Sequence, residues 1–447
     1  MPLDPRGDGA IGVGSQPAAR DPGEDTVYDT ATKTPPLLTP LMRWFMLAMV
    51  LANIAGSMSP FLMPIYLTEL GASVAQVGLV FTLSSVAILA LQIVGGWISD
   101  SIGRLRAIAI GSVGGILGFV ALLLAPTWQW MMVALAIYQF PFALVGPSFS
   151  AFIAENSTQE NRGRVYGITD TIFGVCGVLG PPLGGWLAGA YSFKTMLLAA
   201  AALYSVAAGL RIWMARAWRS PAPHGGPAQD EGRRRLSAAS FKGSMGAMVS
   251  MLLAGGIITW IFITDSTSDI AFRLSGELAP LYLQKVAGIS LQQIGLLGSI
   301  NALASMFVPL LSGRLTDRYG ERLPIVSGFL LIAGAFVAFL QARTFLGFAL
   351  SWVIFGIGGG FLGPAYQSLI SKVVPSHLLG TFTGVFRSSA GFLAQPAPWI
   401  GAQLWERFSP RLPFIITAAS SLIVVPLIWL KFKVPDKAPE AVAAVEP

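Results

Sequence analysis

Apolar runs of about twenty residues recur in this chain from Trp44 to Leu430, and they limit its possible folds more than any other feature. A run of that length crosses a hydrocarbon core of roughly 30 Å as a helix, in which every backbone polar group is satisfied internally. With 54% hydrophobic and 11% charged residues, the chain is also far more apolar than a soluble globular protein. The sequence therefore predicts a polytopic, all-α membrane protein.

Gly, Pro and charged residues divide the apolar sequence into twelve predicted transmembrane helices. The first six span about 43–68, 76–98, 106–125, 129–154, 164–189 and 195–217, and the other six about 256–284, 292–313, 323–342, 346–371, 380–404 and 412–432. The predicted organisation is a disordered cytoplasmic tail at 1–42, a six-helix bundle at 43–218, a cytoplasmic linker at 219–255, a second six-helix bundle at 256–433 and a cytoplasmic tail at 434–447.

The two predicted bundles are copies of one another, related by a constant offset in residue number. The pattern Gly-x3-Asp-x2-Gly occurs at Gly96, Asp100 and Gly103 and again, in the same register, at Gly313, Asp317 and Gly320. Further matches of Gly, Pro, Ser and Gln at this offset cover nearly the whole of each half. Among them, Ser73 with Gln76 and Ser290 with Gln293 read as capping boxes. A parallel repeat of two six-helix bundles is a transporter architecture, with the substrate site between the halves near the bilayer midplane.

Lys and Arg residues are concentrated on one side of the predicted membrane. The loops on that side contain, among others, Arg104, Arg162, Arg322 and Lys372. By the positive-inside rule these loops and both termini face the cytoplasm, and we expect a multi-pass protein of the cell inner (plasma) membrane. The net charge of +7 thus reflects topology in a lipid bilayer, and we expect no nucleic-acid partner.

The loop between the predicted second and third helices carries a short charged motif, made of Gly96, Asp100, Gly103, Arg104 and Arg106. It resembles motif A of the major facilitator superfamily, and the resemblance extends over roughly residues 43–433. The resemblance implies two bundles that alternate between inward-open and outward-open states, with this loop as a cytoplasmic gate. In such a gate Asp100 meets the positive end of the eleventh helix, and Arg104 pairs with Glu155.

The second half carries a modified copy of the motif, at Gly313, Asp317, Arg318, Gly320 and Arg322. It has Glu321 where the superfamily motif has Arg, and Lys372 stands at the position equivalent to Glu155. We therefore expect the first copy to be the stronger gate. The alternative for both copies is a tight charged loop without a gating role.

The predicted fifth helix contains Gly180, Pro181, Pro182, Gly184 and Gly185. This stretch resembles motif C, which in the same superfamily is associated with drug:proton antiporters, so the resemblance implies efflux. Proline can kink a membrane helix into a hinge, and glycine lets a neighbouring helix approach closely. The alternative is packing with no bearing on the direction of transport. The basic residue of motif B is missing from the fourth helix, between Ala134 and Gly146.

The predicted seventh helix carries Asp265, Asp269, Arg273 and Glu277 at successive i+4 spacing. Charged residues inside a membrane are costly and face the protein interior or a wet cavity, where they pair with one another. We expect Arg273 to pair with Asp269 and Glu277, and the set to bind substrate or carry protons. The alternative is a static ladder of ion pairs.

Asp170 in the predicted fifth helix and Arg387 in the eleventh stand at equivalent positions of the repeat and have opposite charges. Paired between the halves, they would form a bridge that breaks and reforms during transport. The alternative places each in water near the cytoplasmic entrance.

Polar and aromatic residues on the helices that line the cavity in this superfamily complete the predicted site. The candidates are Asn53, Ser57, Tyr138, Gln139, Tyr366, Gln367 and Trp399. The first-half candidates lie among Met, Phe and Leu, whereas the charges belong to the seventh helix, so one wall is apolar and the other charged. This asymmetry favours an amphipathic substrate.

Several classes of function lack the residues they need. His224 and His377 have no ligand-spaced partners, which disfavours a metal site, and the single Cys176 excludes an intramolecular disulfide. Gly356 to Gly360 lie inside a predicted span, and no Walker sequence follows them. We therefore expect no cofactor and no enzymatic activity, with a proton gradient as the energy source.

These observations predict a monomeric secondary active transporter that works by alternating access and exports an amphipathic or drug-like small molecule in exchange for protons. One alternative is uptake of a charged metabolite, or translocation of a lipid or lysolipid. An alternative of another class is a non-transporting membrane receptor with the same fold.

Overall fold

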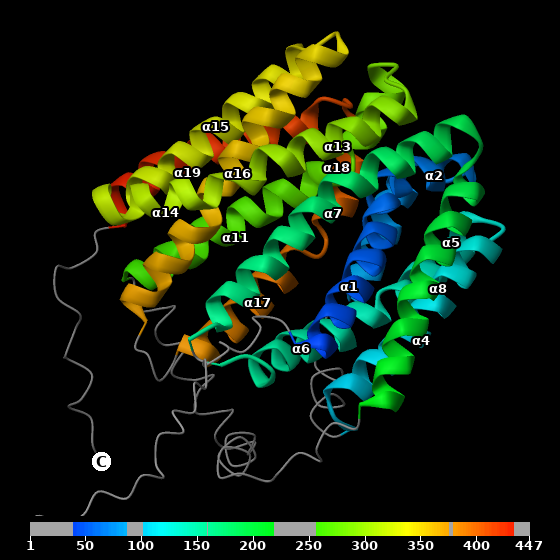
Figure 1. Ribbon diagram of the computed structural model, residues 1–447. Helices are drawn as coiled ribbons and strands as arrows, with labels where there is room; N and C mark the ends of the chain where they lie inside the picture. Colours follow the sequence, from blue (N-terminus) through cyan, green and yellow to red (C-terminus); the bar gives the residue numbers. More distant parts are fainter. Residues whose placement is uncertain (1–38, 87–101, 159, 219–255, 375–378, 433–447) are drawn as a thin grey trace, which may run out of the picture. The chain divides into compact units, whose positions relative to one another are not determined.

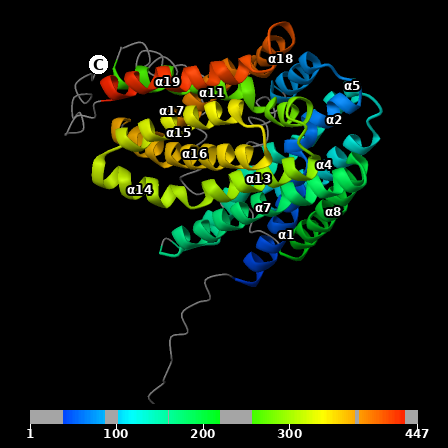
Figure 2. The ribbon, with the colours of Figure 1, turned by 90° about the horizontal axis from the view of Figure 1, so that it is seen from above.

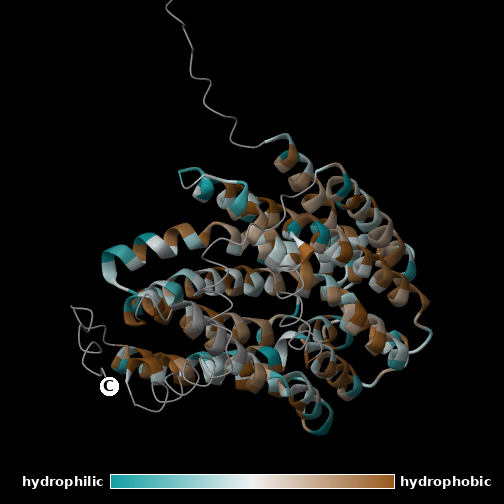
Figure 3. Cartoon of the chain, turned by 90° about the horizontal axis from the view of Figure 1, so that it is seen from below, coloured by the Kyte–Doolittle hydropathy of each residue, from teal (hydrophilic) through white to brown (hydrophobic). Residues whose placement is uncertain are grey.

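The computed structural model describes residues 39–86, 102–158, 160–218, 256–374 and 379–432. Within these ranges the regular secondary structure is helical throughout, and nine helical stretches are long and apolar enough to cross a membrane. Apolar residues predominate along the helices, and hydrophilic residues gather mainly toward their ends (Figure 3). The predicted all-α membrane fold is confirmed. Most of the predicted tails and linker lies outside the described residues.

Three predicted spans are not among these nine. The helix Val74–Val86 is followed by residues 87–101, which are not described. Helix α11 (Ile257–Gly276) contains three charged residues. The eleventh predicted span is divided into α17 (Leu379–Ala394) and α18 (Ala397–Arg407). Twelve membrane-crossing helices therefore remain a prediction.

The helices of the first half pack against one another along their lengths. Besides Val74–Val86 they are α1 (Pro40–Met58), the 3-10 turn η1 (Pro60–Leu62), α2 (Met63–Glu69), α4 (Arg104–Leu124), α5 (Trp128–Tyr138), α6 (Phe140–Glu155), α7 (Arg162–Ala190) and α8 (Phe193–Ala217). Helix α8 contacts both α1 and α4, and the three run side by side in Figure 1.

The second half is built in the same way. Its remaining elements are α12 (Ala279–Leu281), the π-helical turn η2 (Tyr282–Val286), α13 (Leu291–Met306), α14 (Val308–Tyr319), α15 (Arg322–Gln341), α16 (Phe345–Val373) and α19 (Leu412–Lys431). Helix α15 contacts α16 and α19, and Figure 2 shows these helices grouped together.

Prolines divide four spans that we predicted as continuous. They are Pro60 before α2, Pro141 at the start of α6, Pro309 at the start of α14 and Pro396 before α18. Proline has no N–H to donate and its ring collides with the preceding turn, so a helix breaks or restarts there. By contrast, Pro181 and Pro182 lie inside α7 without ending it.

The repeat is visible in the backbone. Glycines with positive φ occur at Gly71 (89°) and Gly103 (89°), and again at the equivalent positions of the second half, Gly288 (69°) and Gly320 (79°). This left-handed conformation strains residues that have a Cβ, which explains why glycine recurs at these positions. The structure also confirms both predicted capping boxes, because each Ser and Gln exchange the reciprocal hydrogen bonds.

Described contacts join elements of the two halves. The Ala75 N–H donates to Glu406 Oε1 at 2.8 Å, and the Trp399 N–H donates to Thr82 Oγ1 at 3.2 Å. Both bonds link the Val74–Val86 helix to α18, while α7 of the first half packs against α13 of the second. The two hydrogen bonds lie toward the helix ends that we predict to face away from the cytoplasm, whereas the packing of α7 against α13 extends inward to Gly174 and Met306.

Candidate functional site

The second half contains a charged cavity of about 690 Å³ bounded by α11, α15, α16 and α17. Asp265, Asp269 and Arg273 line it from α11, and Tyr366 and Gln367 line it from α16. Arg273 Nε lies 3.1 Å from Asp269 Oδ2, and these side chains are 39% and 36% exposed. The expected Asp269–Arg273 pair is thus formed where it is open to solvent. A carboxylate in this position can exchange protons with water or meet a charged ligand.

Glu277 does not join the other three charges. It stands at the C-terminal cap of α11 and is not among the residues that line the charged cavity. Within the described part of the chain, Arg273 pairs with Asp269, and the expected Arg273–Glu277 pair is not formed. Each i+4 step turns the side chain by about 40°, so three steps rotate Glu277 roughly 120° away from Asp265.

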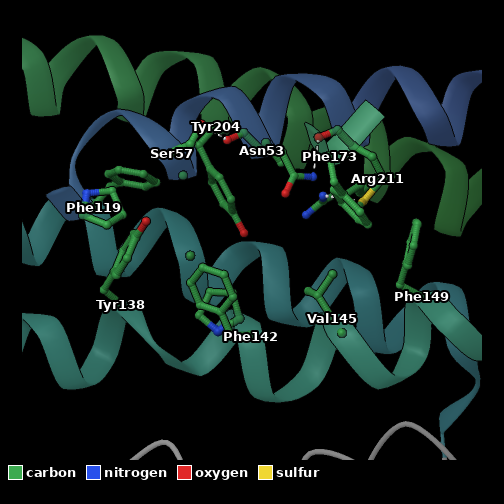
Figure 4. A pocket seen from close by; sticks show the side chains of 17 residues that line it. Asn53, Ser57, Phe119, Tyr138, Phe142, Val145, Phe149, Phe173, Tyr204 and Arg211 are labelled. Atoms are coloured by element: carbon green, nitrogen blue, oxygen red, sulfur yellow. Dashed lines mark hydrogen bonds between the residues drawn. The ribbon is translucent and has the colours of Figure 1, made fainter. Parts of the chain in front are cut away.

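The first half contains a second, aromatic cavity of about 460 Å³. The predicted residues Asn53, Ser57 and Tyr138 line it, whereas Gln139 at the end of α5 does not. Its walls include Phe119, Phe142, Phe149, Phe173 and Tyr204. Figure 4 shows these side chains projecting from α1 and its neighbours toward one space. This cavity suits a flat, largely apolar group.

Arg211 also lines the aromatic cavity, and it is not among the residues predicted for the site. It lies on α8 and is only 2% exposed. The available signal was a cation inside the apolar span 195–217, farther from the end of the span than Arg216, because intramembrane charges usually have a function.

The first gate motif is described only in part. Gly96 and Asp100 lie outside the described residues, while Gly103 adopts its positive φ immediately before α4. Arg104 Nε lies 3.1 Å from Glu155 Oε1, the partner expected from the sequence. The Glu155 side chain is 55% exposed, and a pair this open to water contributes about 0 to 1 kcal/mol to stability. Its gating role stays a prediction.

In the second copy, the charges at the two equivalent positions are exchanged. Glu321 stands at the position equivalent to Arg104, and Lys372 at the position equivalent to Glu155. Glu321 forms an ion pair with Lys372 and accepts a hydrogen bond from the Ser368 hydroxyl at 2.9 Å. The Glu321 side chain is only 5% exposed, so the acid of this pair is better shielded from water than Glu155, while Lys372 is 52% exposed. These contacts give no support to the expectation that the first copy is the stronger gate.

The other gate residues lie at helix ends. Arg106 is exposed on α4, Asp317 and Arg318 are exposed in the last turn of α14, and Gly313 precedes them on the same helix. Gly320 ends α14 with positive φ, and Arg322 at the start of α15 donates from Nε to the Phe432 carbonyl.

The Glu321–Lys372 pair predicts a pH-dependent stability. Burial raises the pKa of Glu321, but hydrogen bonds from Lys372, its own backbone N–H and Ser368, with the charge of Lys372, outweigh burial and lower that pKa below its ordinary value of 4.5. The stabilisation is therefore complete above pH 4.5 and is lost as the pH falls through the folded-state pKa. We expect Lys372→Met to cost roughly 1 kcal/mol at pH 7 and progressively less as the pH falls below 4.5 through the folded-state pKa of Glu321, measured by unfolding in detergent.

The matched control is Lys285→Met, at an exposed position in η2. Its effect on stability should be small and independent of pH. Equal destabilisation by Lys372→Met at pH 7 and below the folded-state pKa of Glu321 would show that the loss of stability does not come from the ion pair with ionised Glu321.

The predicted hinge segment of α7 has two contacting faces. Gly180 and Gly184 face α1, where an added Cβ would collide with Ser57 and with the backbone of Met58. Gly185 faces α13, which belongs to the second half. The segment thus holds three helices close together, while its role as a hinge stays a prediction.

Asp170 and Trp399 are not among the residues that line the two cavities. Asp170 is exposed on α7, and Arg387 belongs to α17 but its side chain is not described, so their bridge stays a prediction. Trp399 lies on α18 with its side chain 42% exposed and its N–H bonded to Thr82. Among the described residues there is no group of three His, Cys, Asp or Glu side chains arranged to hold a metal ion.

Comparisons with known proteins place these features in context. A model of the Major Facilitator Superfamily matches residues 45–395 and, in a second match, 266–447. The chain is 25% identical over 379 residues to a multi-drug resistance efflux pump PmrA homolog of Lactococcus lactis subsp. lactis (strain IL1403), covering 83% of this chain and 88% of that protein. It is 26% identical over 345 residues to the class C tetracycline resistance protein of Escherichia coli, covering 74% and 81% respectively.

A solved structure shares the fold. It is the crystal structure of a bacterial homolog to the human lysosomal transporter Spinster, in an inward-facing and occupied conformation. The TM-score is 0.70 at 15% sequence identity, with 89% of this chain and 98% of that chain covered. At this identity the likeness shows the architecture alone.

Proposed function

Because this chain belongs to the Major Facilitator Superfamily, we propose that it is a secondary transporter that exports an amphipathic or drug-like small molecule in exchange for protons. Its similarity to an efflux pump and to a tetracycline resistance protein supports efflux. We further propose twelve spans in an inner membrane, cytoplasmic termini and a monomeric protein.

The observation that carries proton coupling is the Asp269–Arg273 pair in the charged cavity. A charge near the bilayer centre costs at least about 2.5 kcal/mol, so two charges on one membrane helix need a functional reason. While Asp269 is ionised, it holds Arg273 at 3.1 Å. Protonation removes this attraction and frees Arg273 for another partner. A proton can therefore shift the relative stability of two arrangements of α11, which is what coupling requires.

The difference between the two cavities supports an amphipathic substrate. The cavity of the first half is lined mainly by aromatic and aliphatic side chains, whereas that of the second half contains Asp265, Asp269 and Arg273. A molecule with an apolar body and a polar end satisfies both kinds of surface, and a purely polar metabolite leaves the aromatic wall unused.

Transport by purified protein in vesicles tests this function. We expect amphipathic fluorescent dyes to accumulate in proteoliposomes with an acidic lumen, because protons leaving the lumen drive an antiporter to bring substrate in. Protein-free vesicles with the same gradient give the passive distribution. Accumulation driven by an alkaline lumen would indicate symport and uptake, and flux indifferent to the gradient would refute proton coupling. A protein that moves no dye under any gradient would favour the receptor alternative.

A further inference from the structure

We propose that the aromatic cavity of the first half binds an organic anion, whose acidic group pairs with Arg211 and whose apolar part lies among the aromatic rings. The inference deepens the proposed transport function and rests on it, because it names the chemical class of one substrate. Its evidence is independent of the Asp269–Arg273 pair.

Arg211 is buried well inside its helix. It lies six residues before Ala217, where α8 ends, which corresponds to about 9 Å along the axis. Long basic side chains near a helix end usually extend their charged group to water. The Arg211 side chain instead turns into the protein, is only 2% exposed and lines the aromatic cavity. Figure 4 shows it between Asn53 and Phe173, facing the cavity.

The partners of Arg211 carry no negative charge. One terminal nitrogen donates to Ser112 Oγ at 3.1 Å, and the other lies 3.0 Å from Met49 Sδ. The guanidinium carbon is 6.0 Å from the centroid of the Tyr204 ring. The third nitrogen, Nε, is buried and has no hydrogen-bond partner among the described residues. Arginine keeps its charge when buried, so donors and a positive charge are left uncompensated.

The described residues of the first half supply no carboxylate to this site. None of the described residues that line the aromatic cavity is acidic. Of the four described acidic residues of this half, Glu155 pairs with Arg104, and the other three are exposed, namely Glu69 at the end of α2, Glu160 before α7 and Asp170 on α7. An uncompensated buried charge is unfavourable, and a negative group entering the cavity would compensate it.

The rest of the cavity selects the form of that anion. Its volume of about 460 Å³ is within the range of sites for small organic molecules. Phe119, Phe142, Phe149 and Phe173 offer aromatic faces that stack on flat apolar groups. A carboxylate suits Arg211 because a guanidinium can donate two parallel bonds to its oxygens. An inorganic anion would compensate the charge but leave the aromatic wall unfilled.

Calorimetric titration of the purified full-length protein in detergent tests the proposal with naphthoate and its neutral amide, naphthamide. We expect the unaltered protein to bind naphthoate at least about 10-fold more tightly than naphthamide. Arg211→Gln should weaken naphthoate binding about 10- to 100-fold and leave naphthamide binding nearly unchanged. Arg211→Lys keeps the charge but cannot donate two parallel hydrogen bonds, so its affinity for naphthoate should lie between those of the unaltered protein and Arg211→Gln. The matched control is Arg216→Gln, at an exposed position on the same helix, which should bind naphthoate normally.

Three results would overturn the inference. They are equal binding of acid and amide to the unaltered protein, undiminished naphthoate binding in Arg211→Gln, and displacement of naphthoate by an equal concentration of inorganic phosphate. The comparison of the two probes needs no variant, so it decides the question even if Arg211→Gln fails to fold. Gradient-driven dye transport without naphthoate binding would refute this site alone, and naphthoate binding without gradient-driven transport would refute the proposed antiport alone.

Discussion

Replacing Asp269 with asparagine is expected to reduce gradient-driven transport to the level of protein-free vesicles. The amide has nearly the shape of the carboxylate but cannot bind and release a proton, so α11 loses the group that we propose couples protons to transport. It also leaves Arg273, now 3.1 Å from a carboxylate oxygen, without its ionic partner. Dye accumulation in vesicles with an acidic lumen measures the effect. Exchange of dye at equal pH on both sides should persist, because it needs no net proton movement.

The controls for this variant separate charge from structure. Glu69→Gln makes the same kind of replacement at an exposed position at the end of α2, and it should transport normally. Asp269→Glu keeps a titratable group and should retain part of the activity. Full gradient-driven transport by Asp269→Asn would exclude this carboxylate as the coupling group.

The length and position of most described helices follow from apolar patterning. The predicted span 106–125 corresponds to Arg104–Leu124, and 323–342 corresponds to Arg322–Gln341. In these segments the helix length needed to cross the bilayer agrees with the spacing of the Gly, Pro and charged residues that end the apolar run, so hydropathy places the helix correctly. The proline interruptions escaped prediction because proline acts through its missing N–H and its ring, to which hydropathy is insensitive. Thus Pro396 separates α17 from α18 in a segment that we predicted as one continuous helix.

The candidate site was less accessible to sequence reasoning because it depends on which side chains meet. The Arg104–Glu155 pair followed from a recognisable motif. Glu321 and Lys372 were identified from the sequence as departures from that motif, but their pairing was not predicted. Regular i+4 spacing suggested one stripe, yet its accumulated rotation separates Glu277 from Asp265. Arg211 stands out in the sequence only as a cation inside an apolar span, which does not show that its side chain lines a cavity.

Replacing Gly185 with valine is expected to reduce transport about 10-fold or more, because overpacking a tight contact costs about 1–3 kcal/mol. A Cβ at this position would lie 2.6 Å from the Leu291 carbonyl oxygen and 3.1 Å from Gly295 Cα, both in α13. Backbone atoms cannot rotate away as a flexible side chain can, so α7 and α13 must separate. Since these helices belong to different halves, the substitution should favour a conformation in which α7 and α13 are farther apart at this contact.

Spin-label distances measure this separation. Labels attached at exposed Lys194 and Lys285, each replaced by cysteine in a Cys176→Ala background, report on the first and second halves respectively. Gly185→Val should shift their distances to longer values. The matched control is Gly209→Val on α8, where an added Cβ would meet no atom within 4 Å. If Gly185→Val, like the control, leaves the distances and the transport rate unchanged, close approach at Gly185 does not hold the halves together. The glycine at this contact would then be unrelated to alternating access.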